Sequence, residues 1–259
     1  MVHGKQLFMK KDHFKLKHTG LRSRIVDPSI TPFRKYQTFM VGSRSFLFLL
    51  KYEILTSLFG FMPGIAGLVL RKFFYPFLFR RVGRNVIFGR NITIRHPKKI
   101  IIGNNVVIDD NCVLDAKGEN NQGIIIGDNV FISRNSIISC KEGNVEIGND
   151  SNIGTNCLIH SETSLEIGSY VLIAAYCYIV AGGNHDFDKT EIPIILQPSI
   201  SKGGIIISDD VWLGADVKVL DGSKIGRGTI VGAGSVVNSG LGKFSVAMGI
   251  PAKVVKKRK

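Results

Sequence analysis

Residues 147–159 read IGNDSNIGTNCLI, with an apolar residue at every sixth position, at 147, 153 and 159. Triplets with this spacing recur between residues 82 and 237: Val82/Phe88/Ile94, Ile102/Ile108/Leu114, Ile126/Ile132/Ile138, Ile147/Ile153/Ile159, Ile167/Ile173/Ile179, Ile207/Leu213/Val219 and Ile225/Val231/Val237. A fixed hexad is typical of a parallel β-helix, in which three short strands make one coil and the inward side chains of successive coils stack. The sequence therefore predicts an all-β solenoid of about seven coils.

Residues suited to sharp turns occupy fixed positions of the hexads. Gly follows the first apolar residue in six of the seven triplets, as at Gly148, and Asn, Asp or Gly takes the fourth position in six, as at Asp150. We expect left-handed backbone at both positions. Cys112, Cys157 and Cys177 lie at the fifth position, which favours a small residue and indicates a packing role. With no CxxC pair and no secretory signal peptide, the cysteines indicate a reducing cytoplasm rather than a disulfide framework.

The net charge of +14 is concentrated at the two ends of the chain. Residues 1–81 contain 15 Lys and Arg against three acidic residues, a net charge of +12. Residues 82–252 contain 14 against 17, a net charge of −3, and residues 253–259 contain five basic residues and no acid. A nucleic-acid groove along the repeats would need basic residues there, so the distribution argues against nucleic acid as a partner.

Three regions follow from these patterns. Residues 1–81 are predicted to form a basic arm, over 1–35, and a helical, hydrophobic segment, over 46–80. The 17-residue uncharged run 54–70 is too short and too interrupted by Gly and Pro to span a membrane. Residues 71–81 carry two cations at each end of an aromatic-rich run, which favours peripheral contact with an anionic membrane; the alternative is a helical cap on the open end of the solenoid. The β-helix is expected over 82–239, and a basic tail over 240–259.

The hexads stop after Ile179 and resume at Ile207, and a Gly-rich polar stretch with one histidine, His185, lies near the start of this interruption. A long loop on a rigid solenoid is where functional residues are expected, so residues 181–204 are the candidate catalytic loop. A histidine there can be a general base for a hydroxyl or an amine, or simply an exposed loop residue. The residues alone leave both interpretations open.

Several motifs resemble the hexapeptide-repeat acyltransferases, in particular the maltose, virginiamycin and polysaccharide O-acetyltransferases. They are GNHD at 183–186, VWLGA at 211–215, VGAGSVV at 231–237 and GIPAK at 249–253. The resemblance implies a left-handed parallel β-helix, a homotrimer and acetyl-CoA bound between neighbouring solenoids. It also implies that His185 is the catalytic base.

A donor site can be argued from the small residues. Gly214-Ala215 and Gly232-Ala233 lie 18 residues apart and are predicted to stack, giving the pantetheine arm of coenzyme A a flat surface with exposed backbone groups. Lys253 and Arg258 of the basic tail could neutralise the nucleotide phosphates. The candidate contacts to the acceptor are Asn156, His160, Asn184, Asp186 and Trp212.

The sequence thus predicts an acyl-CoA-dependent O-acyltransferase, using acetyl-CoA and no metal, that acts on a sugar or a polysaccharide or lipid-linked glycan precursor. N-acetylation of an amino sugar and serine acetylation are alternatives, since one base serves a hydroxyl or an amine. A metal-dependent hydratase of the γ-carbonic-anhydrase type would need three histidines around zinc, and the repeats offer His96, His160 and His185. A non-catalytic scaffold is the fourth alternative. The expected location is the cytoplasm, at the inner face of the membrane.

Overall fold

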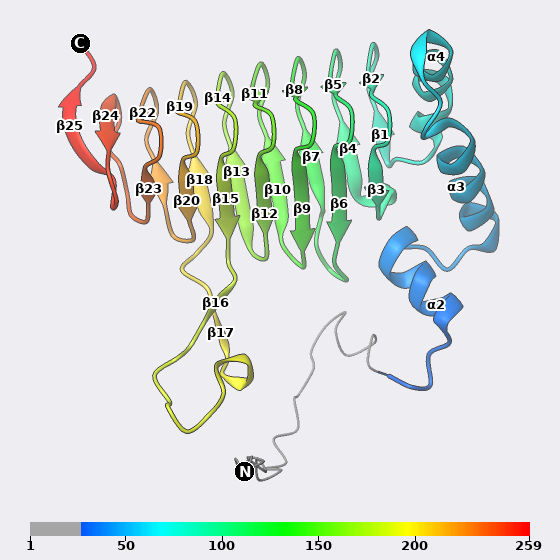
Figure 1. Ribbon diagram of the computed structural model, residues 1–259, viewed down its shortest axis with the longest axis horizontal. Coiled ribbons are helices and arrows are strands. Elements are labelled where there is room, and N and C mark those ends of the chain that lie inside the picture. Colours follow the sequence, from blue (N-terminus) through cyan, green and yellow to red (C-terminus); the bar gives the residue numbers. More distant parts are fainter. Residues whose placement is uncertain (1–26) are drawn as a thin grey trace, which may run out of the picture.

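The computed structural model describes residues 27–259, which form a parallel β-solenoid of about seven turns preceded by a helical segment (Figure 1). Each turn gives one strand to each of three parallel sheets, named A, B and C in chain order. This confirms the predicted solenoid of about seven coils. The part of the predicted basic arm before residue 27 lies outside the described residues.

The strands of the coils are short. Sheet A comprises β1 (Arg81–Val82), β4 (Ile100–Ile102), β7 (Ile124–Ile126), β10 (Asn144–Ile147), β13 (Ser164–Ile167), β18 (Ile205–Ile207) and β21 (Lys224–Ile225). Sheet B comprises β2 (Ile87–Phe88), β5 (Val107–Ile108), β8 (Phe131–Ile132), β11 (Asn152–Ile153), β14 (Leu172–Ile173), β19 (Trp212–Leu213), β22 (Ile230–Val231), β24 (Ser245–Met248) and β25 (Lys253–Lys257). Sheet C comprises β3 (Thr93–Arg95), β6 (Val113–Lys117), β9 (Ile137–Lys141), β12 (Leu158–Ser161), β15 (Tyr178–Ala181), β20 (Lys218–Leu220) and β23 (Val236–Val237).

The hexad residues form the core. Of the 21 predicted inward residues, 20 are buried, and Val82 in the first coil is half-buried. Strand register stacks them in columns: Ile147 pairs with Ile126 on one side and with Ile167 on the other. Each buried aliphatic side chain contributes roughly 1.5–3 kcal/mol relative to an exposed one, so the columns hold successive coils together.

Of the two hexad positions predicted to have left-handed backbone, one does and the other does not. The fourth hexad position is left-handed as predicted, for example at Asn85 (φ 57°) and Asp150 (φ 56°). Gly at the second position is not left-handed, so that prediction is wrong. A Cβ at Gly148 would lie 2.5 Å from the carbonyl carbon of Gly168 on the next coil, so these glycines are needed for close stacking of backbones.

The four cysteines, Cys112, Cys140, Cys157 and Cys177, are buried and free. The packing role predicted for the three at hexad position five is confirmed. Burial raises the pKa of the Cys112 thiol to about 11 and that of Cys140 to about 12, which keeps both thiols neutral and unreactive.

The N-terminal segment covers the open end of the first coil (Figure 1). Its elements are α2 (Pro32–Tyr36), the π-helix η1 (Gln37–Val41), α3 (Phe46–Phe59), α4 (Gly64–Phe74) and the 3₁₀-helix η2 (Tyr75–Phe77). Tyr52 of α3 donates its hydroxyl to the carbonyl of Ile94, at 2.6 Å. Phe79 stacks on Phe88, whose side chain is fully buried. The cap interpretation is therefore confirmed for the inner side of this segment, while membrane contact stays a prediction.

Arg71 is buried within this segment and does not belong to its cationic surface. It donates to the carbonyls of Phe59, Met62 and Phe88 at 2.8–3.0 Å, and so ties the α3–α4 turn to the first coil. None of the helices in residues 27–259 is long and apolar enough to cross a membrane.

The region predicted as a basic tail contains two strands that extend sheet B. Strand β24 pairs in parallel with β22, and β25 returns antiparallel to β24. The C-terminal basic residues are thereby held against the last coil of the solenoid.

Candidate active site

The candidate catalytic loop, predicted over residues 181–204, leaves the solenoid at the edge where sheet C meets sheet A. In each coil the chain runs from sheet A to B to C, so three edges result, named AB, BC and CA. Strand β15 ends the fifth coil and β18 begins the sixth, and the loop between them projects from the CA edge (Figure 1). The foot of the loop is glycine-rich on both sides: Gly182 (φ 97°) and Gly183 (φ 75°) leave, and Gly203 (φ 98°) and Gly204 (φ 84°) return. These left-handed conformations favour glycine and allow the chain to turn out of the coil.

His185 lies on a two-stranded ribbon in this loop. Strands β16 (Asn184–His185) and β17 (Ser199–Ile200) are antiparallel, and His185 pairs with Ser199. The imidazole is exposed, and no side chain among residues 27–259 is hydrogen-bonded to it. The histidine is therefore available to an acceptor molecule.

Asp221 anchors both sides of the loop and was not identified from the sequence. Its buried carboxylate, 4% exposed, accepts from the side-chain amide of Asn184 at 3.0 Å. It also accepts from the backbone N–H of Lys202 at 2.6 Å and of Gly204 at 2.9 Å. The residue next to His185 is thus fixed to the sixth coil. In the sequence, Asp221-Gly222 has the composition of an ordinary turn, which conceals this role.

The tip of the loop is ordered by a second buried polar residue, Gln197. Its amide donates to the carbonyls of Lys189 and Ile192, both at 2.9 Å, and its oxygen accepts from the N–H of Lys189. Three apolar side chains of the tip stay exposed, Phe187, Ile194 and Ile195. The η4 turn (Ile194–Leu196) carries the last two.

A polar cluster on the outward face of sheet C lies beside the foot of the loop. The hydroxyl of Ser139 is 2.8 Å from Nδ1 of His160, and Nε2 of His160 is 3.8 Å from Glu162 Oε1. Lys141 forms an ion pair with Glu162 at 2.6 Å. His160 and then Lys141 lower the pKa of Glu162 to about 2, so its carboxylate stays ionised. A Cβ at Gly182 would lie 2.9 Å from Cβ of Glu162, which places the cluster directly under the loop.

The predicted donor residues stack on the BC edge. The N–H of Gly234 donates to the carbonyl of Ala215, and a Cβ at Gly214 would lie 2.6 Å from the nitrogen of Ala233. The predicted stacking of Gly214-Ala215 on Gly232-Ala233 is confirmed. The strip extends back to Ala174-Ala175 of the fifth coil, because the N–H of Asp216 bonds to the carbonyl of Ala175. In the sequence, Ala174-Ala175 directly follow the hexad residue Ile173, just as Gly214-Ala215 follow Leu213, so this position in the hexad could have revealed the pair.

The two predicted basic residues lie at opposite sides of sheet B. Lys253 pairs with Met248 across the antiparallel strands β24 and β25. The Cβ of Met248 lies 3.1 Å from where a Cβ at Gly232 would be. Lys253 is therefore close to the BC edge and the small-residue strip. Arg258 donates to Asp210 at 3.1 Å and to the carbonyl of Gly228 at 2.9 Å, on the AB edge. The structure does not bring Arg258 to the strip.

The predicted acceptor contacts lie in two separate regions of the chain. Asn184, Asp186 and His160 lie at the loop and its foot; the Asn184 amide is engaged by Asp221, and Asp186 accepts from the N–H of Asp188. Asn156 lies at the BC edge of the fourth coil, with a φ of 57°. Trp212 lies on the outward face of sheet B, between Leu172 and Ile230, and is 48% exposed.

One chain does not bring the candidate base and the candidate donor strip together. His185 projects from the CA edge, and Gly214 and Ala233 lie on the BC edge, with the width of sheet C between them. Positions 214 and 221 are seven residues apart in the sixth coil, which corresponds to at most about 23 Å of extended chain.

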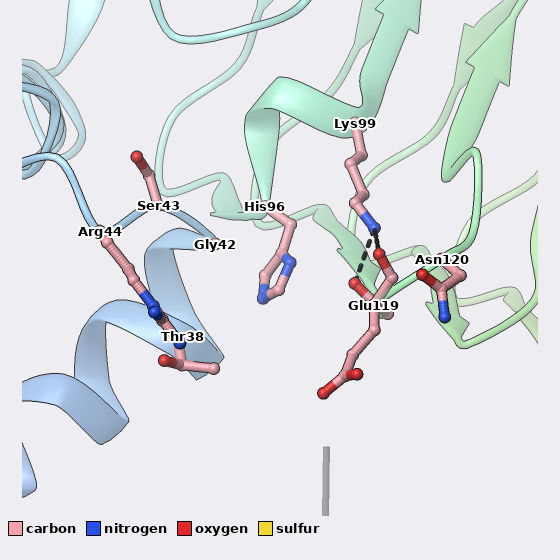
Figure 2. A pocket seen from close by; sticks show the side chains of 9 residues that line it. Thr38, Gly42, Ser43, Arg44, His96, Lys99, Glu119 and Asn120 are labelled. Carbon is pink, nitrogen blue, oxygen red and sulfur yellow. Dashed lines mark hydrogen bonds between the residues drawn. The ribbon is translucent and has the colours of Figure 1, made fainter. Parts of the chain in front are cut away.

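A separate pocket of about 360 Å³ lies between the N-terminal segment and the first two coils (Figure 2). Its lining residues are Thr38, Gly42, Ser43, Arg44, His96, Lys99, Gly118, Glu119 and Asn120. Lys99 donates to the carbonyls of Gly118 and Glu119, and burial lowers the pKa of His96. The pocket is on the CA edge but belongs to coils one and two, whereas His185 extends from coil five.

The three histidines of the zinc alternative are on different coils. His96 follows the first coil, His160 belongs to the fourth and His185 to the loop after the fifth. Within residues 27–259, no group of three or more His, Cys, Asp or Glu side chains is placed to hold a metal ion. The ligand set that a γ-carbonic-anhydrase-type site needs is not assembled in the described chain.

Both ends of the solenoid match known repeat families. Residues 204–239 match "Bacterial transferase hexapeptide (six repeats)", and residues 81–116 match "Hexapeptide repeat of succinyl-transferase".

Curated relatives are acetyltransferases. The chain is 38% identical over 117 residues to the probable acetyltransferase Rv3034c of Mycobacterium tuberculosis, a match that covers 45% of this chain and 38% of that protein. It is 32% identical over 114 residues to the putative lipopolysaccharide biosynthesis O-acetyl transferase WbbJ of Escherichia coli, covering 41% of this chain and 58% of WbbJ. The chain thus spans 38% and 58% of the length of these two relatives.

A solved structure of a mutant of AntD, an N-acyltransferase from Bacillus cereus in complex with dTDP and coenzyme A, is 27% identical, with a TM-score of 0.46. The match covers 70% of this chain and 85% of AntD. Two hexapeptide-repeat models thus match the first and last coils of a solenoid of about seven turns, and the curated relatives of the chain are acetyltransferases.

Proposed function

We propose that this protein is an acyl-CoA-dependent acyltransferase that transfers an acetyl group to a hydroxyl of a carbohydrate acceptor. The observation that carries the proposal is the exposed His185 on a ribbon that Asp221 fixes from both sides. An exposed histidine on an anchored loop suits a general base, because its position is held while the imidazole stays open to the acceptor. The similarity to curated acetyltransferases, WbbJ among them, supports the acyl group and the carbohydrate class.

In the proposed reaction, His185 takes the proton of the acceptor hydroxyl, and the oxygen attacks the carbonyl carbon of the thioester. The carbon–sulfur bond breaks, the thiolate of coenzyme A leaves, and the imidazolium returns its proton to the sulfur. The products are an ester and free coenzyme A. No covalent enzyme intermediate and no metal enters these steps.

We propose a homotrimer with a shared site, in which the loop of one chain reaches the small-residue strip of its neighbour. Two features of the single chain support this. The CA and BC edges are too far apart to form one site, and Phe187, Ile194 and Ile195 at the loop tip expose apolar surface that a neighbour could cover. In this arrangement Lys253 approaches the phosphates of coenzyme A, and Asn156 and Trp212 lie beside the donor.

Transfer to an amine is the second candidate, because the same base serves an amino sugar. A single assay separates the two. Release of coenzyme A is measured across a panel of sugars, amino sugars, nucleotide-sugars and membrane glycolipids, and the product bond is identified by its lability to hydroxylamine, which cleaves esters and spares amides.

The decisive variant is His185→Ala, with Thr190→Ala as the control because Thr190 is exposed in the same loop. Loss of a general base lowers turnover by about a hundredfold or more, while acetyl-CoA binding is retained. Retained turnover in His185→Ala would remove His185 from the mechanism.

We place the protein in the cytoplasm at the inner face of the membrane. The support is the buried, free state of the four cysteines and the net charge of +12 before the repeats against −3 within them. Location near anionic lipid would bring the site close to a lipid-linked acceptor.

A further inference from the structure

Two stripes of large apolar side chains cover the outward side of the N-terminal segment. On α3 and the turn after it they are Leu47, Leu50, Ile54, Leu58 and Phe61, and on α4 and η2 they are Ile65, Val69, Phe73 and Phe77. These nine side chains are between 41% and 81% exposed. We call them the outer face. Their spacing of three or four residues is that of one side of a helix.

The outer face is not required by the cap. The opposite side of α3 buries Phe48, Leu49, Tyr52 and Leu55 against the solenoid, so the packing of the helix is complete without the outer residues. A helix that is apolar on both sides is normally buried on both sides. Exposed large apolar side chains in this number, along two neighbouring helices, are typical of an interaction site.

The surroundings of the outer face are basic. Residues 27–80 contain seven Lys and Arg against two acidic residues, a net charge of +5. One of the seven, Arg71, is buried in its structural role, but Arg44, Lys51, Lys72 and Arg80 are exposed. Of the two acids, Glu53 accepts a hydrogen bond from Tyr36. The exposed cations therefore lack a matching set of acidic neighbours in this segment.

We propose that the outer face docks onto an anionic lipid bilayer and holds the solenoid at the membrane surface. Apolar side chains would enter the interface while the exposed cations meet lipid phosphates, an arrangement typical of peripheral amphipathic helices. A second copy is the weaker partner on charge, because pairing two outer faces would bring two surfaces of the same positive sign together. The proposal stands whether or not the chain transfers acyl groups, and its test does not use the acyltransfer assay.

The test is sedimentation of the full chain with vesicles of phosphatidylcholine, with and without phosphatidylglycerol, at low and high salt. The full chain is expected to pellet with the anionic vesicles and to detach partly at high salt. The double variant Leu47→Glu/Ile65→Glu should lose at least about tenfold in partitioning, since two highly exposed apolar side chains would no longer insert. Lys72→Glu should lose about fivefold, at low salt only.

The matched control is Val255→Glu, which introduces the same charge at an exposed position of β25, at the other end of the solenoid. It should sediment like the wild type. All variants keep the basic residues before position 27, so unchanged sedimentation of the double variant would overturn the proposal. A second result would also overturn it: the wild type does not bind anionic vesicles, and light scattering shows that the double variant dissociates an oligomer. The outer face would then be a contact between chains.

Discussion

Replacing Asp221 by alanine should release the catalytic loop while leaving the solenoid intact. The substitution removes three hydrogen bonds at the foot of the loop, to Asn184, Lys202 and Gly204. Hydrogen bonds to an ionised acceptor contribute about 1.5–3 kcal/mol each, so about 5 kcal/mol of local stabilisation is lost. The loop projects from the coils, so most of this cost falls on its own order rather than on global unfolding. A displacement of the base by about 1 Å costs about a hundredfold in rate, and we expect kcat/KM to fall between tenfold and a hundredfold.

Hydrogen exchange tests the cause directly. The N–H of Asp186 bonds across the ribbon to the carbonyl of Pro198 at 2.9 Å, and the N–H of Leu172 bonds between coils to the carbonyl of Val211 at 2.9 Å. Asp221→Ala should accelerate exchange at Asp186 and leave Leu172 protected. Asp188→Ala, an exposed carboxylate of the same loop, is the control and should change neither. Wild-type protection at Asp186 together with wild-type activity in Asp221→Ala would refute the anchoring role.

Three further predictions concern the solenoid and the donor strip. Gly148→Ala should destabilise the protein by at least about 2 kcal/mol, because the added Cβ would lie 2.5 Å from the backbone of the next coil. Gly183→Ala places its Cβ more than 4 Å from any other atom, so it should cost only about 1 kcal/mol, within the loop. Thermal melts of the two variants test this difference. The pKa of Glu162 is lowered to about 2, so its contribution to stability is present above the ordinary carboxyl range near 4.5 and is lost as the pH falls toward 2. Melting temperatures of wild type and Glu162→Gln should therefore converge over this interval, and parallel curves would contradict the ion pair. Lys253→Ala should weaken coenzyme A binding about fivefold by calorimetry, while Arg258→Ala should leave it unchanged because Arg258 lies on the AB edge.

The solenoid could be predicted because one periodic signal, repeated seven times, determines it. Each inward residue needs only to be apolar and at the right spacing, and local sequence carries that information. The reason for Gly at the second hexad position could not be predicted in the same way. Its need arises from the backbone of the next coil, about 20 residues away, and both a left-handed turn and a close approach select glycine.

The site was harder to predict because its parts come from different coils. His185 is a candidate because of its loop and its motif. Asp221, 36 residues later, is the anchor of that loop only because parallel stacking places the sixth coil beneath it. Lys253 and Arg258 are five residues apart, but β25 carries them across the full width of sheet B to opposite edges. Position in the sequence does not reveal which edge a residue reaches.

The most direct test of a site shared between chains is complementation between two inactive variants. His185→Ala removes the base, and Ala215→Trp, at an exposed position of the strip, blocks the donor. Coexpressed and assembled at random, they should recover about a quarter of wild-type coenzyme A release. A shared site is intact when the chain that gives the loop retains His185 and the neighbour that gives the strip retains Ala215, and each condition is met in about half of the cases. Two separately inactive variants that stay inactive after verified mixing would contradict the shared site and, with it, the role of His185 opposite a neighbour's strip.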